Sequence, residues 1–158
     1  MPKRASVAVQ VATVRGTSGT RAANQSTPRK DHFVCRDGQY YAGEHIIVDF
    51  HGAHGLDDME LMERALRQAV ARAGATLLHL HLHRFTQNGG ISGVAVLSES
   101  HISVHSWPEI GFAAFDVFMC GKASPDLAVQ VLREHFRPER ECLQRSYRGS
   151  VKSNERLY

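Results

Sequence analysis

The stretch Ser98-Glu99-Ser100-His101-Ile102-Ser103-Val104-His105-Ser106-Trp107-Pro108-Glu109, followed later by Cys120-Gly121, decides how this chain is interpreted. It brings the Glu99–Ser100 peptide bond, His105 and Cys120 into one apolar, strand-like region. These are the groups needed to break a chain at a serine and to use the new chain end as an electron sink.

The chemistry open to Ser100 follows from its hydroxyl group. The hydroxyl can attack the carbonyl carbon of Glu99, which moves the acyl group from nitrogen to oxygen. Loss of the serine α-proton then eliminates the ester and leaves dehydroalanine, which hydrolyses to a ketone-capped chain end. Each step needs a proton transfer close to the bond, and an imidazole such as that of His105 suits this task.

The spacing of Ser100 and His105 sets a geometric condition on this chemistry. Their positions differ by five, an odd number, so a straight strand would place the two side chains on opposite faces. They could meet only if the backbone bends or bulges near Ser100. A self-cleaving bond would require strained backbone, an expectation that comes from the cleavage chemistry and not from the residue pattern.

Length and composition indicate one globular domain. The chain has 158 residues, 42% of them hydrophobic, which is enough for a sizeable core. No apolar run approaches the roughly 18 residues of a membrane span, so we expect no membrane association. The three cysteines (Cys35, Cys120 and Cys142) are an odd and sparse set, which argues against a disulfide framework and for a reducing, cytoplasmic compartment.

The charge is unevenly distributed along the chain. The formal net charge is +3, yet residues 32–132 carry six Lys or Arg against eleven Asp or Glu. The basic excess lies in residues 1–31 and 133–158, without interleaved aromatic residues, so we expect no nucleic-acid partner. An acidic centre favours a cationic small molecule.

Hydrophobic periodicity predicts two helices among several strands. The expected helices begin near Asp57 or Asp58 and at Ser124-Pro125, where a cap precedes proline at the first helical position, and the first ends at Gly74. The expected strands cover 45–50, 76–85, 93–97, 101–106, 111–119 and 142–148.

Tight turns between the central strands imply antiparallel pairing, with both helices on one face. The predicted fold class is therefore α+β, a two-layer sandwich with a mainly antiparallel sheet. We expect residues 1–38 to be a disordered extension, 39–150 the catalytic domain and 151–158 a flexible tail.

Three alternating histidines support a rival hypothesis. His79, His81 and His83 would lie on one face of a strand, where they could form a metal site. No Asp, Glu or Cys stands beside them at ligand spacing, so we expect a contact face and no metal.

The stretch quoted first closely resembles the self-cleavage and active-site segment of prokaryotic S-adenosylmethionine decarboxylases. The resemblance runs from about Gly43 to Gly149 and includes Gly74-Ala75-Thr76, His83-Arg84-Phe85 and Gly90-Ile91-Ser92-Gly93-Val94. In this family a serine becomes a pyruvoyl group, the enzyme's only cofactor. The smallest members are dimers with sites at the interface.

The resemblance implies a role for each matching residue. Cleavage would follow Glu99, Ser100 would become the pyruvoyl group, and His105 with Ser92 would assist this processing. Cys120 resembles the acid that protonates the substrate carbon after decarboxylation. Phe85 resembles an aromatic residue that stacks on adenine, and Glu109 a carboxylate that binds the ribose hydroxyls; the match of Phe85 needs a one-residue adjustment in the loop that follows it.

The implied function is conversion of S-adenosylmethionine to its decarboxylated form and carbon dioxide, for spermidine biosynthesis. The substrate amine would form a Schiff base with the pyruvoyl group, without pyridoxal phosphate or metal. The two fragments would stay associated, and the enzyme would be a homodimer or higher homo-oligomer. Two alternatives stay open: a pyruvoyl-dependent arginine or ornithine decarboxylase of the same fold, and a non-catalytic homologue acting as a regulatory subunit. The segment His51–Gly55 and the long N-terminal extension depart from the family pattern.

Overall fold

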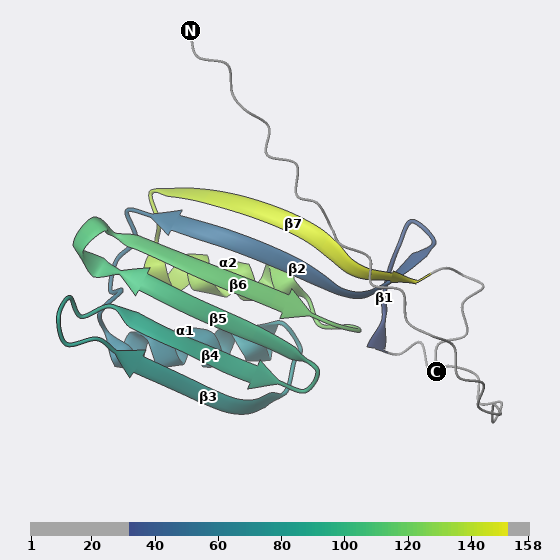
Figure 1. Cartoon of the computed structure of the whole chain (residues 1–158), viewed down its shortest axis with the longest axis horizontal. Helices are drawn as coiled ribbons and strands as arrows, with labels where there is room; N and C mark the ends of the chain where they lie inside the picture. The colour runs from purple at the N-terminus through teal and green to yellow at the C-terminus, as the bar shows by residue number, and fades with distance from the viewer. Residues whose placement is uncertain (1–31, 152–158) are drawn as a thin grey trace, which may run out of the picture.

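A computed structural model describes residues 32–151, which form one antiparallel sheet and two helices. The elements in chain order are β1 (Val34–Arg36), β2 (Gln39–His51), α1 (Met59–Arg72), β3 (Leu77–Arg84), β4 (Ile91–Leu97), β5 (Ser100–Trp107), the short 3₁₀ helix η2 (Pro108–Ile110), β6 (Phe112–Met119), α2 (Pro125–Phe136) and β7 (Arg140–Val151). The sheet order is β1-β2-β6-β5-β4-β3, and β7 also pairs with β2 (Figure 1).

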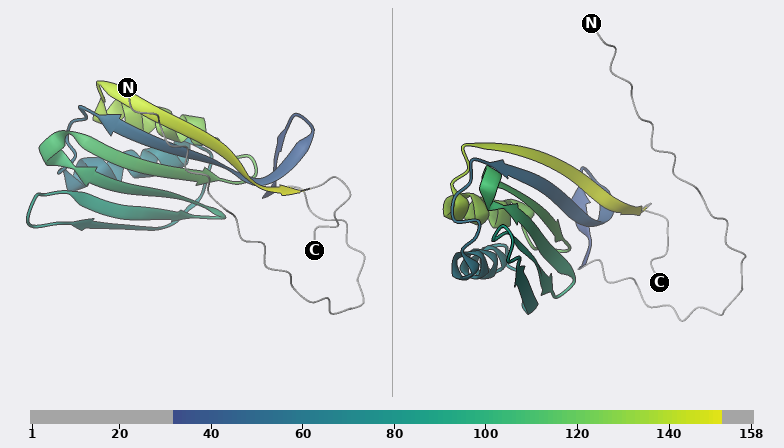
Figure 2. Two further views of the ribbon diagram at one scale, coloured as in Figure 1. Left: turned by 45° about the horizontal axis from the view of Figure 1, so that its top comes forward. Right: turned by 60° about the vertical axis from the view of Figure 1, so that its left-hand side comes forward.

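Both helices cover the same face of the sheet (Figure 2). Alternate residues of β2, namely Ile46, Val48 and Phe50, are buried against them. Apolar positions repeat at helical spacing on α1 and α2, so each helix presents one apolar stripe to the sheet. The prediction of a two-layer α+β sandwich is confirmed.

The helix ends follow the predicted signals closely. Asp58 caps α1, because its carboxylate accepts a hydrogen bond from the backbone N–H of Leu61 at 3.0 Å. Gly74 follows this helix with a φ of 75°, a left-handed conformation that glycine adopts without strain. Ser124 and Pro125 begin α2 as predicted, although the Ser124 side chain makes no capping hydrogen bond.

The boundaries of the domain differ from the sequence-based expectation. β1 begins at Val34, so ordered structure starts before residue 39, inside the expected disordered extension. β7 ends at Val151, the first residue of the expected tail. The rest of both expected end segments, residues 1–31 and 152–158, lies outside the described part of the chain. Within residues 32–151 no helix is long and apolar enough to cross a membrane.

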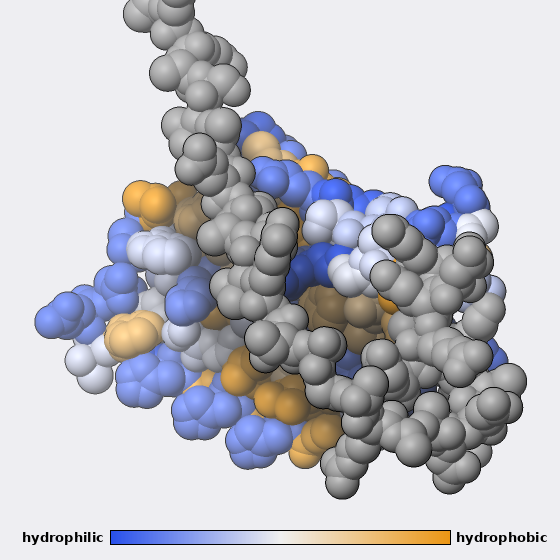
Figure 3. All heavy atoms as spheres, turned by 45° about the vertical axis from the view of Figure 1, so that its right-hand side comes forward, coloured by the Kyte–Doolittle hydropathy of each residue, from blue (hydrophilic) through white to orange (hydrophobic). Residues whose placement is uncertain are grey.

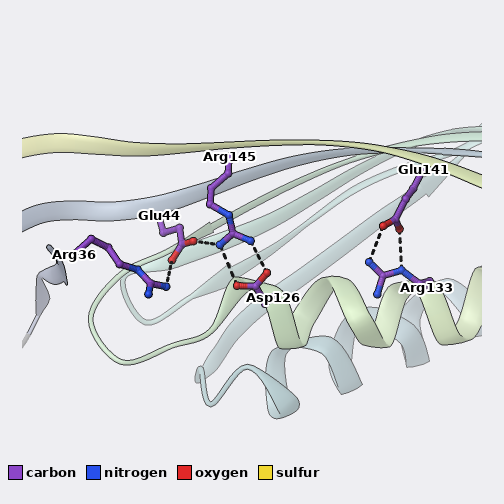
Figure 4. A network of polar contacts seen from close by, with 6 residues as sticks. All are labelled: Arg36, Glu44, Asp126, Arg133, Glu141 and Arg145. Carbon is purple, nitrogen blue, oxygen red and sulfur yellow. Dashed lines mark hydrogen bonds and ion pairs between the residues drawn. The ribbon is translucent and has the colours of Figure 1, made fainter.

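A charged network ties β7 to both layers (Figure 4). Arg145 donates hydrogen bonds to Glu44 on β2 and to Asp126 in the first turn of α2, the latter at 2.5 and 3.0 Å. Arg36 lies 3.6 Å from the other oxygen of Glu44. The Glu44 side chain is only 4% exposed, so these two arginines supply the polar partners that its burial requires. The hydrogen bond from Arg145 lowers the pKa of Asp126.

The second face of the sheet, which we call the open face, is not covered by either helix (Figures 1 and 2). Cross-strand register assigns seven histidines to it: His45, His51, His79, His81, His83, His101 and His105. Apolar side chains lie among them, and Ile47, Val96 and Trp107 are 38–40% exposed. Figure 3 shows apolar patches beside polar ones on the molecular surface.

Candidate active site

Ser100 begins β5 directly after a two-residue turn. Leu97 and Ser100 are register partners, so Ser98 and Glu99 alone connect β4 to β5. Glu99 has a φ of 75°, in a region that non-glycine residues rarely adopt. Such a residue stores on the order of 1–3 kcal/mol and persists only where its surroundings hold it. Backbone strain therefore lies at Glu99, the residue directly before the Glu99–Ser100 bond.

Cys120 follows β6 and meets Ser100 across the sheet end. Its backbone N–H donates a hydrogen bond to Ser100 Oγ at 3.1 Å. Burial raises the pKa of the Cys120 thiol; hydrogen bonding from Ser100 lowers it, and the charge of Glu99 raises it further. The net shift is upward, which keeps the thiol in its protonated form at neutral pH.

A cavity of about 200 Å³ joins these groups. It is lined by the turn with Ser98, Glu99 and Ser100, by the segments 74–76 and 120–123, and by His32. The imidazole Nδ1 of His32 lies 2.7 Å from a carboxylate oxygen of Glu99. Sequence reasoning missed His32, because it falls in the stretch expected to be disordered and no motif links it to Glu99.

His105 lies on the open face rather than in this cavity. Its Nδ1 lies 3.1 Å from Ser92 Oγ, and the two residues are register partners on β5 and β4. β5 pairs with β4 and β6 without a register shift. His105 is therefore displaced from Ser100 by five residues, roughly 16 Å along a strand, and points to the other face. The bulge that would have brought them together is absent from β5.

The two residues expected to bind the nucleoside lie beyond the far end of β5. Phe85 follows β3, is 48% exposed and lines a cavity of about 490 Å³. Glu109 lies in η2 and accepts a hydrogen bond from Asn88 Nδ2 at 3.1 Å. Asn88 lines the same cavity as Phe85, so one loop links both predicted groups. Asn88 was not predicted, since only the fold brings its amide to Glu109.

The candidate residues thus form two separate groups. We call Glu99, Ser100 and Cys120 the Ser100 end, and Ser92, His105, Phe85 and Glu109 the His105 end. The groups lie toward opposite ends of β5.

The remaining histidines of the open face show no metal-binding cluster. His79, His81 and His83 are exposed on β3, at the edge of the sheet. Within residues 32–151 no group of three or more His, Cys, Asp or Glu residues is arranged to hold a metal ion. His45 instead contacts Asp116 at 3.2 Å, and burial, together with the nearby His45, lowers the pKa of His101. The three cysteines are free.

Comparison with known proteins assigns the family. Residues 44–149 match the family model described as S-adenosylmethionine decarboxylase. The chain belongs to the S-adenosylmethionine decarboxylase family. The match begins and ends close to the limits expected from the motifs, Gly43 and Gly149.

Individual relatives of this family align with more than two thirds of the chain. The S-adenosylmethionine decarboxylase proenzyme of Thermomicrobium roseum is 46% identical over 110 residues, 69% of this chain and 95% of that protein. The proenzyme of Methanococcus maripaludis is 41% identical over 116 residues, 72% of this chain and 94% of its own length.

A solved structure supports the same assignment. The crystal structure of the adenosylmethionine decarboxylase from Aquifex aeolicus superimposes with a TM-score of 0.66 at 32% identity, covering 73% of this chain and 97% of that one. The predicted family, fold class and enzyme class are confirmed.

Proposed function

We propose that this chain is a self-processing S-adenosylmethionine decarboxylase whose pyruvoyl group arises from Ser100. The observation that carries the proposal is the Ser100 end, where a strained Glu99 precedes a serine hydroxyl beside Cys120 in one cavity. Relatives named as proenzymes support a processing step.

The cleavage uses only groups of the chain and one water molecule. Ser100 Oγ bonds to the Glu99 carbonyl carbon, the C–N bond breaks, and the hydroxyl proton ends on the Ser100 nitrogen. Elimination removes the Ser100 α-proton and releases the Glu99 carboxylate, which leaves dehydroalanine. Tautomerisation and addition of water then release ammonia and leave a ketone. The products are the fragments 1–99 and 100–158.

The Ser100 end fits the resulting group, which supplies an electron sink for decarboxylation. Cys120 holds a proton in the same cavity and delivers it to the substrate α-carbon. The raised thiol pKa supports this role, because a thiol can donate only while it is protonated.

We further propose that the working unit is a dimer in which two open faces meet. His105 cannot reach Ser100 of its own chain, since roughly 16 Å of regular strand and the sheet itself separate them. Ser100 is the first residue of β5, so a second copy packed on the open face can bring its His105 end past the end of this strand to the Ser100 end of the first. The exposed Ile47, Val96 and Trp107 give this face apolar area to bury.

The substrate assignment rests on the His105 end. Phe85 offers an exposed ring for adenine, and Glu109 offers a carboxylate for the ribose hydroxyls. Arginine and ornithine lack the adenosine and would leave both groups unused. The decarboxylated product would serve as the aminopropyl donor in spermidine synthesis.

The test combines intact mass with substrate turnover. Purified wild-type protein should give two fragments cut between Glu99 and Ser100, and Ser100→Ala should give one uncut chain. Carbon dioxide release from carboxyl-labelled S-adenosylmethionine should exceed release from labelled arginine or ornithine, and Glu109→Gln should raise KM. An uncut wild type refutes self-processing, whereas faster turnover of arginine or ornithine refutes only the substrate.

A further inference from the structure

Residues 32–36 form a short strap across the Ser100 end, and they precede the family match at residue 44. β1 pairs with the beginning of β2, which fixes the strap to the sheet. The carbonyl oxygen of His32 accepts a hydrogen bond from the backbone N–H of Gly121 at 3.1 Å. Arg36 contacts the buried Glu44. The strap is therefore anchored to the loop that follows Cys120 and to the strand beside it.

His32 also contacts the residue whose peptide bond is to break. Its Nδ1 lies 2.7 Å from Glu99 Oε2, in the cavity that holds Ser100 and Cys120. Lys122 is the other basic residue lining that cavity. Glu99 has a φ of 75°, a conformation that persists only when the surroundings hold the residue in place. The contact with His32 can hold Glu99 in this conformation.

We propose that His32 is a positioning residue for self-cleavage, which acts by holding the Glu99 side chain. The inference rests on the proposed cleavage between Glu99 and Ser100. Because the turn has only two residues, fixing the Glu99 side chain restricts the carbonyl carbon that Ser100 Oγ attacks. His32 belongs to the same chain as the Ser100 that it would help, whereas the His105 of that chain lies at the other end of β5.

The experiment follows cleavage of newly made full-length protein by intact mass over time. His32→Ala should slow the appearance of fragments 1–99 and 100–158 about fivefold, the factor that corresponds to roughly 1 kcal/mol for an exposed ion pair. His32→Lys replaces the imidazole with an ammonium donor for the Glu99 carboxylate and should cleave within about twofold of wild type. His135→Ala is the matched control, since His135 also makes one side-chain contact, to Gln68, but on the helical layer.

A double-mutant cycle separates positioning from a general loss of structure. If His32 acts through Glu99, His32→Ala should add little to the effect of Glu99→Gln. The proposal is overturned if His32→Ala cleaves as fast as His135→Ala, if His32→Lys is as slow as His32→Ala, or if the two substitutions simply add. An uncut wild-type chain would instead overturn the self-processing reaction itself.

Discussion

The Ser100 end and the His105 end occupy the same strand but differ in how the fold supports them. Ser100 sits beside a strained turn, accepts a backbone hydrogen bond from Cys120 and lines a cavity to which His32 and residues 120–123 also contribute. His105 is exposed on the open face, with Ser92 as its register partner and Trp107 as a neighbouring ring.

This difference teaches that a short stretch of sequence can contain both candidate residues although the folded chain does not bring them together. Residues 98–109 contain both the serine and the histidine, yet a regular strand turns them to opposite faces. Ser100 lines a cavity within the chain, whereas His105 is exposed on the open face. In the proposed dimer, a second copy would let both ends act on the same bond.

The experiment with the largest expected effect tests whether the Ser100 end of one copy works with the His105 end of another. His105→Ala and Ser100→Ala chains should each remain essentially uncut when produced alone. Produced together, they should form mixed dimers in which the intact His105 of one copy serves the intact Ser100 of the other. Roughly half of the His105→Ala chains should then be cut if the copies mix at random. Intact mass measures the cutting. If no chain in the mixture is cut, His105 does not act on Ser100 of a second copy.

Removing the thiol should separate processing from catalysis. Cys120→Ala should still yield both fragments but lose about 10²–10⁴-fold in decarboxylation rate, the usual contribution of a general acid. Carbon dioxide release from cut protein gives the rate. A rate within about twofold of wild type would remove Cys120 from the reaction.

The charged network should matter to stability at the Ser100 end. Arg145→Met leaves the buried Glu44 with only the more distant Arg36 and should cost roughly 3 kcal/mol of unfolding free energy. Arg133→Met is the matched control, because Arg133 pairs with Glu141 in a more exposed setting, and should cost at most about 1 kcal/mol. Denaturant unfolding of uncut Ser100→Ala backgrounds measures both; equal costs would contradict the special role of Glu44.

The smallest expected effect is a change in the pKa of the Cys120 thiol. Hydrogen bonding from Ser100 lowers the pKa of Cys120 while burial raises it, so Ser100→Ala should raise that pKa further. In a Cys35→Ser, Cys142→Ser background, the pH midpoint of Cys120 alkylation should move upward in Ser100→Ala relative to the uncut His105→Ala chain. A downward shift would mean that Ser100 does not stabilise the thiolate.

Local signals predicted the fold well where they were strong. Asp58, Gly74 and Ser124-Pro125 marked helix ends because capping and positive φ depend on the residue itself. β1 was missed, since three residues are too few for a periodic pattern and β2 supplies the pairing. β2 and β7 also run longer than predicted, because each one's hydrogen bonds extend the other.

For the candidate site, the sequence named candidate residues but did not predict how the fold groups them. The alternation of a strand correctly placed Ser100 and His105 on opposite faces, and no bulge in β5 reversed this. The contacts of His32 with Glu99 and of Asn88 with Glu109 join residues 67 and 21 positions apart, so only the folded chain brings them together.

The strand order has a consequence for how the protein would assemble after the proposed cleavage. Cutting at Glu99–Ser100 leaves β1–β4 on one polypeptide and β5–β7 on the other, yet β2 lies between β7 and β6, and β4 pairs with β5. The two polypeptides are interleaved through three strand pairings, so neither can retain the sheet alone. Refolding of the denatured, cut protein is then a bimolecular reaction whose midpoint depends on protein concentration, whereas the uncut precursor folds as a single molecule. The continuous chain of the precursor thus keeps the two halves together during the first folding, and the cut removes this link.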